Sequence, residues 1–130
     1  MYIKTTNDIT VTVNPQYLET ESSPEDSHYV WSYHVKIDNL SSESVHLKSR
    51  YWKIIDAQGL SQEVRGDGVV GEQPCIDPGK SFEYTSGAPL RTPGGLMVGQ
   101  YHMEKQNGET MDIEIPAFSL DSPYQQAIVN

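Results

Sequence analysis

The stretch Tyr29-Val30-Trp31-Ser32-Tyr33-His34-Val35-Lys36-Ile37 alternates large apolar side chains with side chains that are mostly polar. Its odd-numbered residues are aromatic or β-branched, and a period of two is typical of a strand with one buried face. Residues 29–37 are therefore predicted to form a strand whose odd-numbered side chains point into the core of a β protein.

The segment that follows predicts an irregular strand. Val45 and Leu47 alternate as inward-facing residues, whereas the bulky residues further along, Trp52 and Ile54, have the opposite parity. One regular strand buries only one parity, so a bulge or a change of sheet is expected near residues 49–51.

Turn-forming residues separate these strands from several others. Pro15 restricts the strand before it to an edge or end position, and Pro116 is expected to end the last strand. Asn107-Gly108 is a strong hairpin signal. Residues 19–28 and 87–95 are expected to be loops. The remaining strands are expected at residues 9–13, 81–86, 96–105 and 110–115, with turns at residues 56–59 and 77–80.

About seven short strands and no helical period predict an all-β fold, an antiparallel β-sandwich of the fibronectin type III or immunoglobulin kind. It is expected to be one domain over residues 1–130. Trp31, Tyr33, Trp52 and Phe82 are expected in its core. Tyr101 fits either the tyrosine corner of such folds or an ordinary strand aromatic.

Composition limits the classes of partner. The 130 residues carry a formal net charge of -9, which disfavours nucleic acid and anionic membranes as partners. Cys75 is the single cysteine, the first residues lack a signal-peptide pattern, and no apolar run is long enough to span a bilayer. We therefore expect a cytoplasmic protein with no membrane partner.

Three glycines, Gly66, Gly68 and Gly71, spell the fingerprint of a dinucleotide-binding loop. That fingerprint needs a helix beginning inside it, and the prolines at positions 74 and 78 argue against one. We therefore predict a loop between strands. The residues proposed as a candidate binding loop are Arg65, Gly66, Asp67, Gly68 and Gly71.

The glycine motif has two structural interpretations. In one, successive backbone N–H groups form an anion-binding nest, with Arg50 and Arg65 adding positive charge. In the other, the glycines supply backbone conformations that other residues avoid. Asp67 and Glu72 place negative charge beside the loop and oppose anion binding, which favours the second interpretation.

Laid out in this order, the strands resemble the bacterial ApaG family, also called CorD, from about Thr10 to Leu120. The resemblance rests on these motifs: Ser49-Arg50-x-Trp52-x-Ile54-x-Asp56-x-x-Gly59, Val64-x-Gly66-x-Gly68-Val69-Val70-Gly71-Glu72-x-Pro74, Pro78-Gly79-x-Ser81-Phe82-Glu83-Tyr84-Thr85-Ser86-Gly87-Ala88-Pro89-Leu90, Met97-x-Gly99-x-Tyr101-x-Met103 and Ile115-Pro116-x-Phe118-Ser119-Leu120.

This resemblance implies a fibronectin type III-like sandwich with no established enzymatic activity. It also implies a link to cobalt tolerance, magnesium efflux and a genetic neighbourhood of diadenosine tetraphosphate hydrolysis. The same domain occurs in larger eukaryotic proteins, including F-box proteins, as a recognition module. A fold by itself does not specify function.

The residues predict neither a metal centre nor a catalytic one. The four histidines show no metal-ligand spacing, although His34 and His46 are candidates for cross-strand neighbours. The acids of residues 19–26 are expected to form a solvated loop, and Cys75 is expected to be a buried or inert thiol. No cofactor is expected.

We therefore expect a non-enzymatic binding module that recognises an unidentified protein partner through its glycine-rich and proline-rich loops. The alternative is a ligand-binding protein in divalent cation (cobalt or magnesium) or nucleotide and pyrophosphate homeostasis, which would bind an anion or a divalent cation weakly. Phosphoester hydrolysis is a third, weaker candidate. Exposed sheet edges also allow two copies to pair into a homodimer.

Overall fold

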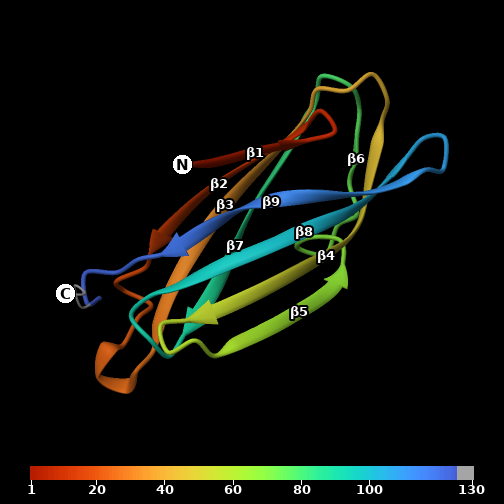
Figure 1. The fold of residues 1–130 in the computed structure, drawn as a ribbon. Coiled ribbons are helices and arrows are strands. Elements are labelled where there is room, and N and C mark those ends of the chain that lie inside the picture. Colours follow the sequence, from red (N-terminus) through yellow and green to blue (C-terminus); the bar gives the residue numbers. More distant parts are fainter. Residues whose placement is uncertain (126–130) are drawn as a thin grey trace.

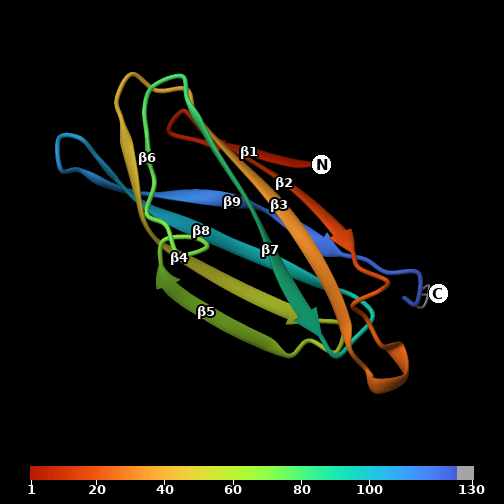
Figure 2. The same cartoon turned by 180° about the vertical axis from the view of Figure 1, so that it is seen from behind.

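A computed structural model describes residues 1–125 of the chain. Figures 1 and 2 show two facing layers of strands joined by short turns. The elements are β1 (Tyr2–Thr6), β2 (Ile9–Tyr17), the 3-10 turn η1 (Pro24–Asp26), β3 (Tyr29–Asn39), β4 (Val45–Asp56), β5 (Ser61–Asp67), β6 (Cys75–Ile76), β7 (Ser81–Leu90), β8 (Gly95–Lys105) and β9 (Thr110–Leu120). The predicted antiparallel β-sandwich is confirmed, with nine strands in this part of the chain.

Every strand pair is antiparallel. The first sheet has the order β1-β2-β3-β7, and the second has the order β5-β4-β8-β9 with the short β6 also paired to β4. Each sheet turns one apolar face towards the other, so the alternation that defines each strand also fills the space between the layers.

The core is centred on aromatic side chains from both sheets. Tyr33 of β3 lies 5.5 Å from Trp52 of β4 and 5.8 Å from Phe118 of β9, measured between ring centroids. Trp31 is fully buried and donates from its indole Nε1 to the carbonyl of Asp121 at 2.8 Å. These predicted core residues are confirmed, whereas Phe82 is only partly buried against them.

The parity conflict within β4 has the predicted cause. Its register against β8 shifts between Leu47 and Ser49, so one residue is inserted and the strand changes parity there. Val45 and Leu47 before the shift and Trp52 after it are all buried. The sequence therefore located this bulge to within about two residues.

Proline misled three strand boundaries in different ways. β7 runs through Pro89 to Leu90, where residues 87–95 were expected to be a loop, and β9 runs through Pro116. Both are edge strands, which need only alternate N–H groups for pairing, and Pro116 also lies in a register shift opposite Val98. β2 likewise runs past Pro15 to Tyr17, beyond the expected residues 9–13, but the edge position expected for Pro15 is confirmed, because β1 pairs β2 only as far as Val13.

The N-terminal strand β1 was not predicted. Its residues are mostly exposed, so the sequence lacks the apolar alternation that marks other strands. It forms because its backbone pairs with β2, from Tyr2 opposite Val13 to Thr6 opposite Ile9.

Candidate functional site

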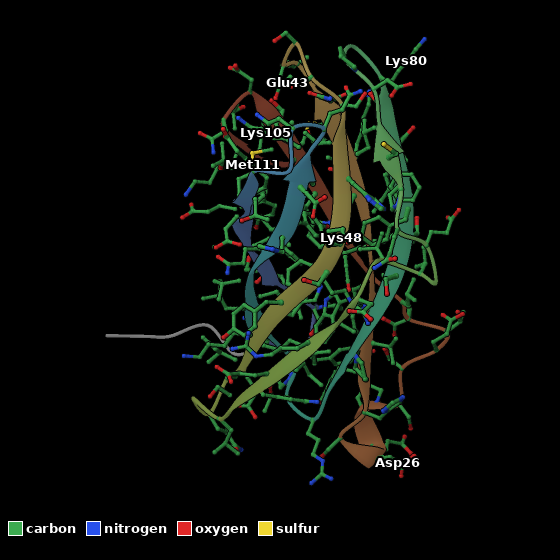
Figure 3. All side chains as sticks on the ribbon, turned by 90° about the vertical axis from the view of Figure 1, so that its right-hand side faces the viewer. Asp26, Glu43, Lys48, Lys80, Lys105 and Met111 are labelled. Carbon is green, nitrogen blue, oxygen red and sulfur yellow. The ribbon has the colours of Figure 1, made fainter. Side chains whose placement is uncertain are left out.

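The glycine motif begins in a strand and ends in a hairpin. Gly66 and Asp67 are the last residues of β5, so the loop starts one residue after them rather than at Arg65 as expected. The segment Gly68–Pro74, here called the glycine loop, leads from β5 to β6. It lies on the side of the sandwich that Figure 3 faces, near the labelled Lys48.

The tip of the glycine loop is a two-residue turn. Val69 and Glu72 exchange both backbone hydrogen bonds at 2.8 Å. Between them Val70 has φ 44° and Gly71 has φ 81°. Positive φ at both central residues is the signature of a type I′ turn. The side chain of Val69 is buried, whereas that of Val70 is 53 % exposed.

Gly66 and Gly68 answer different steric demands. A Cβ on Gly66 would lie 2.9 Å from Nη1 of Arg50, so Gly66 leaves room for that guanidinium. Gly68 has φ 62°, and a Cβ there would collide with the backbone carbonyl oxygen of Glu72. The two glycines are thus explained by the packing of the protein itself.

Arg50 fastens the base of the loop to β4. Its Nη1 donates to the carbonyl oxygens of Asp67 at 3.1 Å and Gly68 at 2.9 Å. The backbone N–H of Gly68 and the side-chain Nε2 of Gln73 both donate to the carbonyl of Lys48, at 2.9 and 2.8 Å. The loop base is therefore held from both sides, while its tip projects.

These contacts bear on the anion-nest interpretation. The N–H groups of Gly68, Val69 and Glu72 all donate hydrogen bonds to backbone carbonyls of the protein itself. Arg50 meets loop carbonyls, and the guanidinium of Arg65 stacks on the ring of Tyr51, 4.3 Å from its centroid, on the outer face of the sheet. The two arginines expected to assist an anion are thus already engaged elsewhere.

A shallow depression of about 440 Å³ lies on that outer face, beside the start of the loop. Arg65, Gly66 and Asp67 of the predicted set contribute to its lining, together with His102 and Asp112, whose Nδ1 and Oδ1 are 3.0 Å apart. The structure therefore brings Arg65, Gly66 and Asp67 to this depression and Gly68 and Gly71 to the projecting turn.

Buried tyrosine hydroxyls lie between the sheets near Arg50. The hydroxyls of Tyr84 and Tyr101 form a short hydrogen bond with each other. Burial raises the pKa of both, and it also raises the pKa of Tyr33. The partner of the Tyr101 hydroxyl is thus a side chain, so the tyrosine-corner interpretation was wrong and the ordinary strand aromatic holds.

The histidines separate onto different sheets. His34 on β3 contacts Thr85 and Glu83 of β7, and His46 on β4 contacts the carbonyl of Gln73. The idea that His34 and His46 are cross-strand neighbours was wrong, because consecutive strands need not share a sheet. Within residues 1–125 no group of three or more His, Cys, Asp or Glu side chains gathers as metal ligands.

Two features escaped sequence analysis. The role of Arg50 depends on a contact with residues 17 and 18 positions later, which no local pattern reveals. The strained Val70 was detectable in principle, because a glycine at the second central position of a turn is typical of type I′ hairpins. Cys75 is exposed, so the expectation of a buried thiol was wrong, and that of an inert thiol stays a prediction.

Comparison with known proteins identifies the family. The model of the ApaG domain matches residues 19–105. The chain belongs to the ApaG family. It is 57 % identical to Protein ApaG of Paramagnetospirillum magneticum and 58 % identical to that of Brucella canis, in each case over the full length of both chains.

A solved ApaG-like structure supports the same fold. The crystal structure of the putative ApaA protein from Bordetella pertussis superposes with a TM-score of 0.87 at 46 % identity, covering 91 % of this chain and 96 % of that one. The family resemblance seen in the sequence is therefore confirmed. In residues 1–125 no helix has the length and apolar character to cross a membrane.

Proposed function

We propose that this ApaG-family chain is a non-enzymatic binding module that recognises a protein partner through the tip of the glycine loop. The observation that carries the proposal is Val70, a β-branched residue with φ 44° that is 53 % exposed at the end of a firmly anchored turn. The type I′ turn requires the positive φ, but it does not require a β-branched side chain, which is strained at that φ.

The comparison with another turn makes the cost clear. The β1–β2 turn also places two residues at positive φ, and it uses Asn7 and Asp8, which tolerate that conformation. A valine there is a genuine outlier. Backbone strain of this kind costs about 1–3 kcal/mol and clusters at functional positions. The presence of valine at this strained position supports a role for its side chain.

The chemistry around Val70 suggests the kind of partner. Asp67 and Glu72 are exposed beside it, and the whole chain has a net charge of -9. An apolar anchor flanked by carboxylates suits a surface pocket with a basic rim. We therefore infer a protein partner with an apolar pocket bordered by Lys or Arg.

The test replaces Val70 rather than Gly68, since any side chain at Gly68 collides with Glu72. V70N creates the Asn-Gly pair preferred in type I′ turns, so it is expected to raise the free energy of unfolding by about 1 kcal/mol. It also removes the apolar anchor. Parent protein and V70N serve as baits in an extract of the source organism, with bound proteins identified by quantitative mass spectrometry.

The matched control is L60N, because Leu60 is another exposed apolar residue, 66 % exposed, in the β4–β5 turn away from the glycine loop. A partner held by the parent and L60N but lost from the more stable V70N supports the proposal. Equal capture by V70N contradicts it, and so does an extract from which the parent retains no specific protein.

The alternative role, binding of divalent cations or of nucleotides and pyrophosphate, stays a prediction. Calorimetric titration with cobalt, magnesium, pyrophosphate and adenosine polyphosphates tests it. Heat signals that saturate at submillimolar concentration and disappear in R65Q support an anion site beside the loop, and flat titrations oppose it.

A further inference from the structure

Strand β5 forms an open edge of the second sheet. It pairs with β4 along residues Ser61–Asp67, and no described strand lies on its other side. Figure 1 shows it as the outermost strand of its layer. An edge of seven residues presents unpaired backbone groups that another strand can complete.

The hydrogen bonds at both ends of the β4–β5 ladder show which backbone groups face outward. Asp56 donates to the carbonyl of Leu60, and Gly68 donates to the carbonyl of Lys48. In an antiparallel ladder the bonded residues alternate, so the even-numbered residues of β5 bond to β4. The N–H and C=O groups of Ser61, Glu63, Arg65 and Asp67 therefore point away from β4, and among them the carbonyl of Asp67 already accepts a hydrogen bond from Nη1 of Arg50.

The side chains of this edge carry a self-complementary charge pattern. Val64 lies opposite Trp52 and is partly buried in the core, so Glu63 and Arg65 project from the outer face. If two β5 strands pair antiparallel about Val64, Glu63 of each copy lies opposite Arg65 of the other. Ser61 then lies opposite Asp67, and the outward-facing backbone groups meet one another, with the carbonyl of Asp67 shared between the partner's N–H and Arg50.

Neighbouring registers are worse by the same criteria. Moving the centre of symmetry to residue 63 places Glu63 opposite Glu63, and moving it to residue 65 places Arg65 opposite Arg65. Like charges directly opposite each other destabilise a strand pair. The register centred on Val64 also uses the whole strand, from Ser61 to Asp67.

Contacts inside the chain already hold the two charged side chains in place. The hydroxyl of Tyr51 donates to Oε1 of Glu63 at 2.8 Å, and the guanidinium of Arg65 lies over the same tyrosine ring. Side chains ordered in advance lose less conformational entropy when a partner strand arrives.

We propose that two copies of this chain associate through antiparallel pairing of β5 with β5, centred on Val64, to form one continuous sheet. The self-complementary charges favour a second copy over an unrelated peptide, because a two-fold axis presents the same pattern to itself. The other open edge, β7, contains a single charged residue, Glu83, and has no such pattern. Charged edge residues commonly prevent pairing, so the test must separate that role from this one.

Sedimentation equilibrium up to about 1 mM protein measures the association, since an interface of one strand pair is small and reversible. E63R and R65E each place like charges opposite one another twice in the dimer. Each is expected to weaken association by about tenfold or more. The double variant E63R/R65E exchanges the charges and is expected to restore association to within about threefold of the parent.

Two controls complete the test. E109R changes the net charge as E63R does, but it lies in the β8–β9 turn. Its dissociation constant is therefore expected to match that of the parent. E63P removes an outward N–H without touching the β4 ladder, so it is expected to weaken association while the circular dichroism spectrum is kept. It also serves if either charge reversal fails to fold.

The interface is established if association weakens in both E63R and R65E and recovers in the double variant. The proposal is overturned by a parent protein that stays monomeric at about 1 mM. It is equally overturned by a dimer that E63P or the single reversals leave unchanged, or by a folded double variant that does not recover.

Discussion

The two long sides of the sandwich are closed by different means. On one side β1 packs along β9, although the two belong to different sheets. Tyr2 Oη lies 3.0 Å from Ser119 Oγ, and its ring packs on Phe118 at a centroid distance of 6.0 Å. Lys4 forms an ion pair with Glu114. Direct strand contact closes this side along its length.

On the other side β5 and β7 do not pair in the described chain. They approach at one end, where a depression of about 590 Å³ lies between them. It is lined by Leu60 just before β5, by Ser61 at the start of β5, and by Pro89 and Leu90 of β7. Towards the other end they diverge, and the glycine loop lies there (Figure 1). A loop held by a few polar contacts replaces the strand packing of the opposite side.

This difference indicates on which side of the sandwich stability depends on individual residues. On the closed side many contacts hold β1 against β9, so the loss of one side chain is expected to change the free energy of unfolding only slightly. On the open side Gly68, Arg50 and the buried hydroxyls each have a specific task, and their loss is expected to be felt individually.

The largest effect is expected from Gly68, compared with Gly71 in the same loop. G68V places a side chain against the carbonyl of Glu72 at φ 62°, whereas a Cβ at Gly71, φ 81°, meets nothing within 4 Å. We expect G68V to lower the free energy of unfolding by about 3 kcal/mol or more, and G71A by about 1–2 kcal/mol. Urea denaturation followed by tryptophan fluorescence measures both. Equal losses would show that steric collision at Gly68 is relieved by movement of the loop.

A smaller loss is expected when Arg50 becomes methionine. The carbonyls of Asp67 and Gly68 lose their guanidinium donor, and unsatisfied groups at the loop base cost about 2 kcal/mol. R50K is expected to recover only part of this, since one ammonium lacks the fork of a guanidinium. Hydrogen exchange of the Gly68–Gln73 amides should rise in R50M. Unchanged exchange there would mean that Gln73 and Val69 hold the loop without Arg50.

Sequence reasoning succeeded wherever the cause was local. The alternation around Trp31 and the parity change between Leu47 and Trp52 are written in consecutive residues, and both predictions were confirmed. It failed at Pro89 and Pro116 because tolerance of proline depends on a strand being at an edge. Edge position is a property of the assembled sheets, and neighbouring residues do not encode it.

The candidate site was predicted less completely than the fold. The glycine pattern marked the correct region, and the argument against a phosphate-binding helix holds, since no helix begins in it. The reason for Gly66 is non-local, because it makes room for an arginine 16 positions earlier, whereas Gly68 and Gly71 answer to the turn in which they lie. The sequence also could not predict which side of the sandwich the glycine loop lies on, because that depends on the order of the strands in the two sheets.

Alkaline pH offers a test of the hydroxyls buried between the sheets. Burial raises the pKa of Tyr84 and Tyr101 above the 10.0 of a free tyrosine. Below pH 10 both states are protonated and stability is complete. Above it the unfolded tyrosines ionise while the folded ones stay neutral, so stability falls as pH rises. The expected loss is about 1 kcal/mol per tyrosine over the first pH unit.

The double variant Y84F/Y101F isolates this contribution. It removes both hydroxyls of the Tyr84–Tyr101 hydrogen bond together, so no unpaired hydroxyl is left between the sheets. Its free energy of unfolding near neutral pH should therefore stay close to that of the parent. Its decline above pH 10 is expected to be shallower in thermal unfolding followed across the pH series. Parallel declines in the two proteins would assign alkaline unfolding to other groups.

The smallest effect is expected on the closed side, from the same replacement used for Arg50. Lys4 and Glu114 form an ion pair whose side chains are 50 % and 54 % exposed. Exposed pairs contribute about 0–1 kcal/mol, and salt screens them. K4M is therefore expected to change the free energy of unfolding by less than about 0.5 kcal/mol at physiological salt. Because β1 keeps its ladder with β2 and Tyr2 keeps its contact with Phe118, the side stays closed without the charge. A loss in K4M as large as that in R50M would mean that both sides depend on single polar contacts, and the contrast between strand packing and loop anchoring would fail.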